Sequence, residues 1–355
     1  MAVLAPALRD RYDLTLSQVG IALAAPFLGS TLALLAWGLL TDRIGERPVL
    51  AVGLLGAAAA TGGAAVFDGF VLLVALLVVA GASGASVNSA SGRAVMHWFE
   101  ASERGLALGL RQTAIPIGGA VAALVLPQLS LTAAFLALAG ALALTGLVAA
   151  ALIKDRAADP APAATEPAGA VLRDARIWRL SSGSAFLLAP QICLVGFIVL
   201  LLHDRRGFSA GAAAAVLAVV QVLGIGARIG AGRWSDVAGS RLLPLRRIAL
   251  AMAAAVALVA VLVPAPRALL LPPLVVAGVL AMSWNGLSFT AAAELAGPAR
   301  SGAALGLQQT VLALAAAALP APFAALVDAT SWSLAIAVVA LFPLVGWRLL
   351  EPLSG

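Results

Sequence analysis

Two polar segments interrupt apolar stretches of this sequence and carry side chains suited to holding a small polar molecule. The segment GLRQTAIPIGG (109–119) places Arg111 within an apolar run, and GLQQTVLALAA (306–316) places Gln308 at the corresponding position. A guanidinium carries a permanent positive charge and forms paired hydrogen bonds to carboxylates and similar anions. An amide donates and accepts hydrogen bonds without a charge. The two segments together predict a site with one cationic and one neutral group.

The composition indicates which solvent surrounds these groups. The 355 residues are 62% hydrophobic and 11% charged, with a mean hydropathy of +1.05. Soluble domains are instead about 45–50% apolar and about 25% charged. Apolar stretches of about 20 residues, the length that a helix needs to cross a bilayer, recur along the chain. Because these stretches are continuous rather than alternating, they exclude a transmembrane β-barrel and predict an all-α polytopic membrane protein.

Eleven full membrane spans are expected, and Arg111 and Gln308 each lie within one of them. The polar, proline-rich segment 154–173 separates the fifth expected span from the sixth and is typical of a flexible linker. The expected domains are therefore an N-terminal bundle (1–153), a cytoplasmic linker (154–176) and a C-terminal bundle (177–355). The expected spans are 16–40, 48–67, 70–93, 104–127, 131–153, 177–202, 210–233, 246–263, 268–293, 302–326 and 331–349.

The basic residues predict the orientation, because cytoplasmic loops carry an excess of Lys and Arg. One set of alternate loops, with the linker and the C-terminus, holds 15 of these residues, and the other set holds 5. The first set is therefore expected in the cytoplasm, although the loop HDRRGF (203–208) disagrees with this orientation. The net charge of +6 arises from these loops, so the expected partner is a lipid bilayer and not nucleic acid.

The two halves of the chain repeat each other. Asp42 in GLLTDRIGER (38–47) matches Asp236 in GRWSDVAGSR (232–241) at an offset of 194 residues. Asn88 matches Asn285 at an offset of 197, which also relates the segments of Arg111 and Gln308. Three segments in the same order at a nearly constant offset predict two homologous helical bundles side by side.

The segment 38–47 resembles the most specific motif of the major facilitator superfamily (MFS), which lies between the second and third helices. The matching residues are Gly38, Asp42, Arg43, Gly45 and Arg47, whereas Glu46 stands where the family usually has a basic residue. A weaker second copy consists of Gly232, Arg233, Asp236, Gly239 and Arg241. The stretch 97–119 is similar to the junction of the fourth and fifth helices in bacterial members. Its Arg-Gln-Thr followed by Pro-x-Gly-Gly is similar to permeases for small anions such as cyanate or nitrate.

This resemblance implies the MFS fold, with two pseudo-symmetric bundles and twelve helices. It also implies that Asp42 faces the N-terminal end of a helix in the opposite bundle, where unpaired N–H groups and the helix dipole favour an anion. The plainer alternative is a positively charged loop whose aspartate caps the next helix. The residues implied to form a cytoplasmic gate are Asp42, Arg43, Gly38, Gly45, Arg47, Asp236 and Arg241.

The start of the chain departs from the family pattern. The segment 7–18 looks like the first external loop, yet the residues before it would form only about 10 Å of helix against a bilayer core of about 30 Å. We expect these residues to be the stub of a truncated first helix, left by a misplaced start codon or a shortened chain. The alternative is a genuine eleven-span protein with an external N-terminus.

Amides dominate the remaining polar groups within the spans, and most amides at such positions bridge helices, for about 0.6 kcal/mol each. Asn88 and Asn285 stand out because they are equivalent in the repeat. Arg111 shares its helix face with small residues, Ala114 and Gly118 among them, which suits close helix packing or leaves room for a ligand. The alternative is that Arg111 reaches the cytoplasmic headgroups or pairs structurally within the bundle. Arg228 is expected to be a headgroup or gate residue. The predicted cavity residues are Arg111, Gln112, Asn88, Gln308, Gln309, Asn285, Trp284 and Gln191.

The chemistry that is missing narrows the function further. No acidic residue is expected deep within a span, whereas proton-coupled transporters usually carry a titratable relay there. Cys193 is the single cysteine, and His97 and His203 are far apart, so no metal, cofactor or enzyme activity is expected. We therefore expect a monomeric secondary active transporter of a small anion or carboxylate in a bacterial plasma membrane. The alternatives are a proton-coupled drug or metabolite efflux pump and a truncated homologue that does not transport.

Overall fold

Every regular element in the described part of the chain is helical, as the sequence predicts. The computed structural model describes residues 1–98, 104–153, 169–297 and 301–353, without the side chains at 35, 42, 92–93, 95–98, 104–110, 169–170 and 301–302. The first half contains η1 (Ala2–Leu4), α1 (Ala5–Tyr12), α2 (Leu16–Ile44), α3 (Glu46–Val66), α4 (Phe70–Trp98), α5 (Arg104–Val125), η2 (Leu126–Gln128) and α6 (Leu131–Leu152). The second half contains α7 (Gly169–Arg173), α8 (Ala175–Pro190), η3 (Gln191–Val195), α9 (Gly196–Leu200), η4 (Leu201–Arg205), α10 (Ala210–Val237), α11 (Leu242–Leu262), α12 (Arg267–Ser283), α13 (Asn285–Ala296), α14 (Ser301–Ala318), α15 (Pro320–Ala329), α16 (Trp332–Leu350) and η5 (Glu351–Leu353).

Ten stretches of helix in the described part are long and apolar enough to cross a membrane. They match ten of the expected spans to within a few residues, and the remaining expected span, 104–127, corresponds to α5.

Three spans are less regular than expected. The span expected at 177–202 passes through two π-helical stretches, η3 and η4. The spans expected at 268–293 and 302–326 are interrupted at Trp284 and Leu319. Pro190 directly precedes η3 and Pro320 begins α15, and proline lacks the N–H group that a continuous helix requires.

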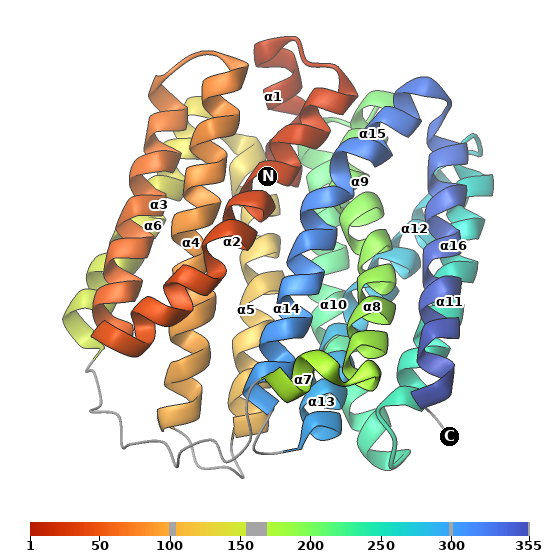
Figure 1. The fold of residues 1–355 in the computed structure, drawn as a ribbon. Helices are drawn as coiled ribbons and strands as arrows, with labels where there is room; N and C mark the ends of the chain where they lie inside the picture. The colour runs from red at the N-terminus through yellow and green to blue at the C-terminus, as the bar shows by residue number, and fades with distance from the viewer. Residues whose placement is uncertain (99–103, 154–168, 298–300, 354–355) are drawn as a thin grey trace.

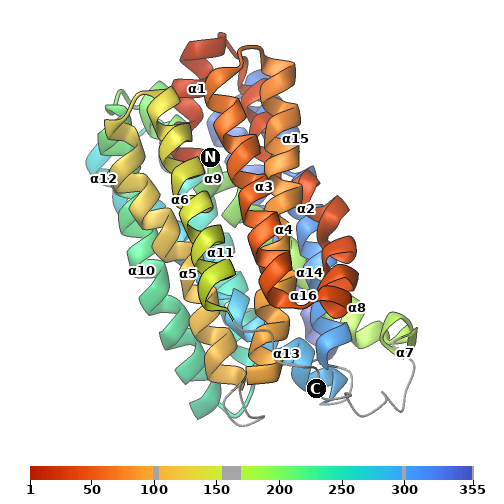
Figure 2. The same ribbon diagram turned by 90° about the vertical axis from the view of Figure 1, so that its left-hand side faces the viewer.

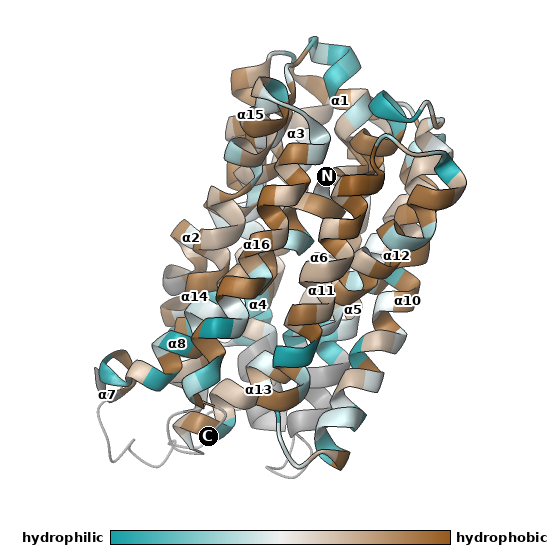
Figure 3. Cartoon of the chain, turned by 90° about the vertical axis from the view of Figure 1, so that its right-hand side faces the viewer, coloured by the Kyte–Doolittle hydropathy of each residue, from teal (hydrophilic) through white to brown (hydrophobic). Residues whose placement is uncertain are grey.

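Large apolar side chains cover the outside of the molecule. Val71 is 82% exposed, Leu152 73% and Leu32 71%. Figure 3 shows hydrophobic residues along the length of the helices and hydrophilic residues gathered mainly toward their ends. Such an apolar surface marks a molecule that is covered by something other than water, and lipid tails cover it in a bilayer.

The helices form two halves that meet along two seams. Helices α2, α3, α4 and α6 pack together in the first half, and α8, α10, α11, α12, α14 and α16 do so in the second (Figures 1 and 2). Across the halves, α2 packs on α14 and α15, and α5 packs on α10. The sequence repeat relates α2 to α10 and α5 to α14. The repeat therefore maps the α2–α14 seam onto the α10–α5 seam, as a pseudo-twofold axis between two bundles requires.

The two ends of the molecule differ in how closely the halves approach. We call them the linker end, where α6 ends and α7 begins, and the α1 end, where α1 lies and α2 begins (Figure 1). At the α1 end α2 lies beside α15, whereas at the linker end α2 lies well away from α14 (Figure 1). The α2–α14/α15 seam is therefore closed at the α1 end.

The first residues form a short buried helical segment at the α1 end. Elements η1 and α1 bury Val3, Leu4 and Leu8 and contact α9. Because α1 continues to Tyr12, the loop expected from residue 7 begins later than predicted. A capping box then starts α2, with Thr15 Oγ1 accepting from the Gln18 backbone N–H at 3.2 Å.

Two glycines allow α2 and α4 to pack backbone against backbone. A Cβ at Gly29 would lie 1.9 Å from the carbonyl oxygen of Val78, and a Cβ at Gly81 would lie 2.0 Å from that of Pro26. A larger residue at either position would force the helices apart. This close contact holds α4, which carries Asn88, firmly against α2.

Candidate functional site

Arg111 on α5 binds polar groups of α4. Its Nε donates to Ser91 Oγ at 2.8 Å, and its Nη2 donates to the Asn88 side-chain and backbone oxygens, each at 3.2 Å. The arginine lies seven residues after the start of α5, about 10 Å along the helix axis. The structure thus brings together two predicted cavity residues, Arg111 and Asn88.

The face of α5 around Arg111 is open rather than packed. Ala114 and Gly118 are exposed, and a Cβ at Gly118 would meet no atom within 4 Å. Helix α5 packs on α10 through Gly119 instead, where a Cβ would lie 2.5 Å from Gln221 Nε2. Ala114 and Gly118 are therefore not packed against another helix, and a solute site on this face stays a prediction.

A second arginine, Arg228 on α10, lies at the seam between α5 and α10. Its Nε donates to the Met282 carbonyl at 2.6 Å, Nη1 to the Gln112 carbonyl at 3.1 Å and Nη2 to Asn285 Oδ1 at 3.1 Å. The bond to Gln112 joins the two halves. Of the two roles expected for Arg228, the headgroup contact is wrong, because its guanidinium is bonded inside the protein, and the gate role stays a prediction. One signal could have revealed this: Arg228 lies nine residues before the end of α10, about 14 Å from that end.

The two arginines have matching surroundings. Asn88 and Asn285 are equivalent in the repeat, and each accepts a hydrogen bond from a guanidinium through Oδ1. The arginine comes from α5 in the first half and from α10 in the second, and these two helices pack against each other. All acceptors that the structure describes around Arg111 and Arg228 are neutral. Neither positive charge is balanced by a carboxylate within the described residues.

Gln191 and Trp284 adjoin the second of these arrangements. Asn285 Nδ2 donates to Gln191 Oε1 at 3.4 Å, which places the two amides next to Arg228. Trp284 is fully buried, and its indole N–H has no hydrogen-bond partner among the described residues. Gln309, on α14, is half-buried and lies outside this series of contacts. The predicted residues Gln191, Asn285 and Gln112 are thus connected through Arg228.

Gln308, the repeat equivalent of Arg111, lies in a different environment. It is fully buried, its Nε2 donates to Ser288 Oγ at 2.5 Å, and Ser184 Oγ lies 3.4 Å from the same nitrogen. Its Oε1 has no hydrogen-bond partner among the described residues. Equivalent positions in the repeat therefore do not form one site, because Gln308 is enclosed within the second half.

At the linker end, the first copy of the glycine–aspartate–arginine motif surrounds the turn between α2 and α3. Gly45 has a φ of 88°, a backbone conformation that favours glycine. Arg47 Nε donates to the Ala150 carbonyl of α6 at 2.5 Å, and Arg43 is exposed. No atom lies within 4 Å of a Cβ built at Gly38. The Asp42 side chain lies outside the described residues, so its contact with the opposite bundle stays a prediction.

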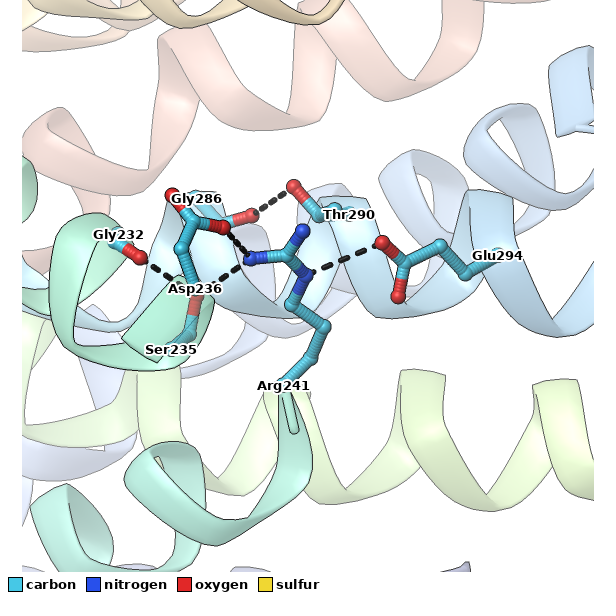
Figure 4. A network of polar contacts seen from close by, with 7 residues as sticks. All are labelled: Gly232, Ser235, Asp236, Arg241, Gly286, Thr290 and Glu294. Atoms are coloured by element: carbon cyan, nitrogen blue, oxygen red, sulfur yellow. Dashed lines mark hydrogen bonds and ion pairs between the residues drawn. The ribbon is translucent and has the colours of Figure 1, made fainter. Parts of the chain in front are cut away.

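In the second copy of the motif, Arg241 joins two acidic residues (Figure 4). It forms an ion pair with Asp236, and its Nε lies 3.0 Å from Glu294 Oε1 of α13. Its Nη1 also donates to Ser235 Oγ at 2.6 Å. Hydrogen bonding to Asp236, followed by Glu294, raises the pKa of Arg241 above its ordinary value, so this arginine stays protonated. All four residues belong to the second half, and the gate role of Asp236 and Arg241 stays a prediction.

Sequence reasoning assigned no role to two acidic residues that join the halves at the α1 end. Asp328 Oδ2 accepts from the Ser17 backbone N–H at 3.0 Å and from Ser17 Oγ at 2.8 Å. Asp204 forms an ion pair with Arg9. The partners are 311 and 195 residues apart, and no sequence pattern connects them.

Comparisons with known proteins agree with this architecture. The family model described as Major Facilitator Superfamily matches residues 1–320. An MFS-type transporter of Mycobacterium tuberculosis (strain H37Rv) is 36% identical over 362 residues, covering 99% of this chain and 81% of the relative. The hexuronate transporter of Bacillus subtilis (strain 168) is 24% identical over 121 residues, covering 34% of this chain and 29% of the relative.

A solved structure has the same fold. This structure is the inward-facing, occupied form of a bacterial homologue of the human lysosomal transporter Spinster. It superposes on this chain with a TM-score of 0.83 at 14% sequence identity. The match covers 99% of this chain and 92% of that structure. The matched family model covers most of the chain, and the mycobacterial relative matches nearly all of it. The chain therefore belongs to the Major Facilitator Superfamily and is a multi-pass membrane secondary transporter rather than an enzyme.

Proposed function

We propose that this transporter carries a small anion, most directly a carboxylate, by opening its two halves alternately at either end of the molecule. The observation that carries the proposal is the pair Arg111 and Arg228. These two guanidiniums belong to different halves and lie on the helices that pack together along the α5–α10 seam.

The electrostatics of this pair favour a negatively charged ligand. Charges within a membrane protein are costly unless an opposite charge is near. The neutral groups around Arg111 and Arg228 orient the guanidiniums without balancing their charge. Arg111 binds its described partners through Nε and Nη2, so Nη1 remains to donate to a ligand. An anion beside Arg111 would supply both the missing acceptor and the opposite charge.

The class of anion follows from donor geometry and from one relative. A guanidinium matches the two oxygens of a carboxylate, with which it forms parallel hydrogen bonds. A hexuronate is a sugar acid with one carboxylate, and the hexuronate transporter of Bacillus subtilis is similar to about a third of this chain. Inorganic anions such as nitrate and cyanate remain within the same class, as the sequence of 97–119 predicts.

We infer the orientation from the excess of basic residues in the loops at the linker end. That end is placed in the cytoplasm of a bacterium, with the C-terminus on the same side, and the α1 end faces outward. In this orientation the described state is closed toward the outside at the α2–α15 seam.

The test is counterflow into proteoliposomes that contain the purified protein and are preloaded with unlabelled solute. Counterflow requires no knowledge of the coupling ion. The labelled solutes are glucuronate, lactate, nitrate and cyanate, with tetraphenylphosphonium as a cationic comparison. A hydrogen bond to a charged group contributes about 1.5–3 kcal/mol, so we expect Arg111→Gln and Arg228→Gln each to raise KM for the transported anion by about 10- to 150-fold.

Arg173→Gln is the matched control, because it removes one exposed arginine from α7 without touching the site. It should leave KM unchanged. Counterflow of the cation without any anion, or an unchanged anion KM in both Arg111→Gln and Arg228→Gln, would refute the proposal.

A further inference from the structure

The seam between α2 and α15 carries a carboxylate that holds the first turn of a helix in the opposite half. Ser17 lies in the first turn of α2, and both its backbone N–H and its hydroxyl donate to Asp328 Oδ2. The first N–H groups of a helix have no partner within the helix, and the helix dipole makes this end attractive to an anion. Asp328, near the end of α15, therefore acts as a cap that belongs to the other bundle.

The local cap of α2 leaves room for this contact. Thr15 Oγ1 accepts from the Gln18 N–H, and Gln18 Oε1 accepts from the Thr15 N–H at 2.9 Å. This capping box does not use the Ser17 N–H, which is the group that binds Asp328. The first turn of α2 is thus satisfied partly by its own residues and partly by the opposite half.

Two neighbouring contacts close the same end. Arg9 of α1 forms an ion pair with Asp204 at the end of η4. One turn below Ser17, a Cβ at Gly20 would lie 2.8 Å from the Pro320 carbonyl oxygen. Together with Asp328, these contacts bring the halves together at the α1 end by charge and by backbone packing.

We propose that Asp328 is the gate residue of the α1 end: its carboxylate holds α2 while that end is closed and releases it when that end opens. Helices α2 and α14/α15 run in opposite directions along one seam. The acid near the end of α15 caps the start of α2, and the resemblance to the family implies that Asp42, near the end of α2, faces the start of a helix in the opposite bundle. The two acids would then hold the same pair of helices alternately, one at each end.

This inference rests on alternating access and not on the identity of the solute. The experiment measures distances between spin labels in the full chain without solute, in a Cys193→Ser background. One pair, at Phe67 and Pro266, reports on the α1 end, and a second pair, at Leu152 and Leu243, reports on the linker end. All four positions are exposed. Failure of the anion proposal would therefore leave this measurement unaffected.

We expect Asp328→Asn to raise the population with a long Phe67–Pro266 distance about 5- to 10-fold, because a neutral acceptor binds the helix end more weakly than a carboxylate. The Leu152–Leu243 distance should shorten in the same population. Asp68→Asn is the matched control, since Asp68 lies at the same end but pairs at 2.7 Å with Arg11 of its own half. Unchanged distances in Asp328→Asn, or an equal shift in Asp68→Asn, would overturn the proposal.

A second variant keeps the test decisive if Asp328→Asn folds poorly. In Ser17→Cys with Asp328→Cys, a disulfide should block counterflow, and a reducing agent should restore it. Each single cysteine variant should transport with or without oxidant. Undiminished counterflow after complete cross-linking would show that the seam does not open during transport.

Discussion

Gly20→Ala is the substitution whose effect the structure specifies most directly. The added Cβ would lie 2.8 Å from the Pro320 carbonyl oxygen, 2.9 Å from Ala321 Cα and 3.0 Å from Ala324 Cβ. Ordinary contacts of a Cβ begin at 3.4 Å. Because two of these neighbours are backbone atoms, no side chain can rotate away, and α2 and α15 must separate.

The added Cβ raises the free energy only of the state that is closed at the α1 end. Overpacking of this kind costs about 1–3 kcal/mol, and it applies while the seam is closed at the α1 end. About 1.4 kcal/mol changes an equilibrium tenfold, so the population open at the α1 end should rise by about 5- to 150-fold. Alanine also favours a helix over glycine by about 1 kcal/mol, but this gain is common to both states and cancels.

The assay is the distance between spin labels at Phe67 and Pro266, measured in detergent and in lipid nanodiscs. Gly226→Ala on α10 is the control, because a Cβ there would meet no atom within 4 Å. It should leave the distances unchanged. If Gly20→Ala gives the same distribution as the wild type, the α2–α15 contact is looser than described and the reasoning fails.

Two further predictions concern other parts of the structure. Arg9→Asp should open the α1 end in the same spin-label assay. Adding Asp204→Arg should restore the closed population, since the swapped pair reproduces the ion pair. If the closed population does not recover, the pair does not hold the halves together. Gln308→Met should leave the KM of the transported solute within about twofold, because the amide is enclosed within the second half. It should lower thermal stability by about 1 kcal/mol, the usual net value of one hydrogen bond. A large rise in KM without loss of stability would instead assign Gln308 to the solute site.

The helices could be predicted from the sequence, because the length of an apolar stretch depends only on local composition. The expected starts and ends of the spans agree with the structure to within a few residues. The interruptions at Trp284 and Leu319 were missed. Pro320 was a visible signal for the second interruption, and the Asn285-Gly286 pair that directly follows Trp284 was one for the first.

The site was predictable only in part. Arg111 and Asn88 were both predicted as cavity residues on consecutive helices, and the structure places them in contact. Their role in binding a solute stays a prediction. The headgroup contact expected for Arg228 was wrong, because two of its partners lie on α5 and α13, 116 and 57 residues away. The surroundings of Gln308 could not be predicted either. The repeat predicts which helix carries it but not that α8 and α13 enclose it.

The neutral surroundings of Arg111 and Arg228 have a consequence for the membrane voltage. In the proposed cycle, Arg111 and Arg228 contribute two positive charges when no solute is bound, and a bound monoanion reduces this to one. Moving one elementary charge through the full potential corresponds to about 2.3 kcal/mol per 100 mV, so voltage acts more strongly on the return of the empty protein than on the passage of the loaded one. A dianion would make the loaded passage insensitive to voltage, and currents recorded with monoanions and dianions would therefore report the charge of the natural cargo.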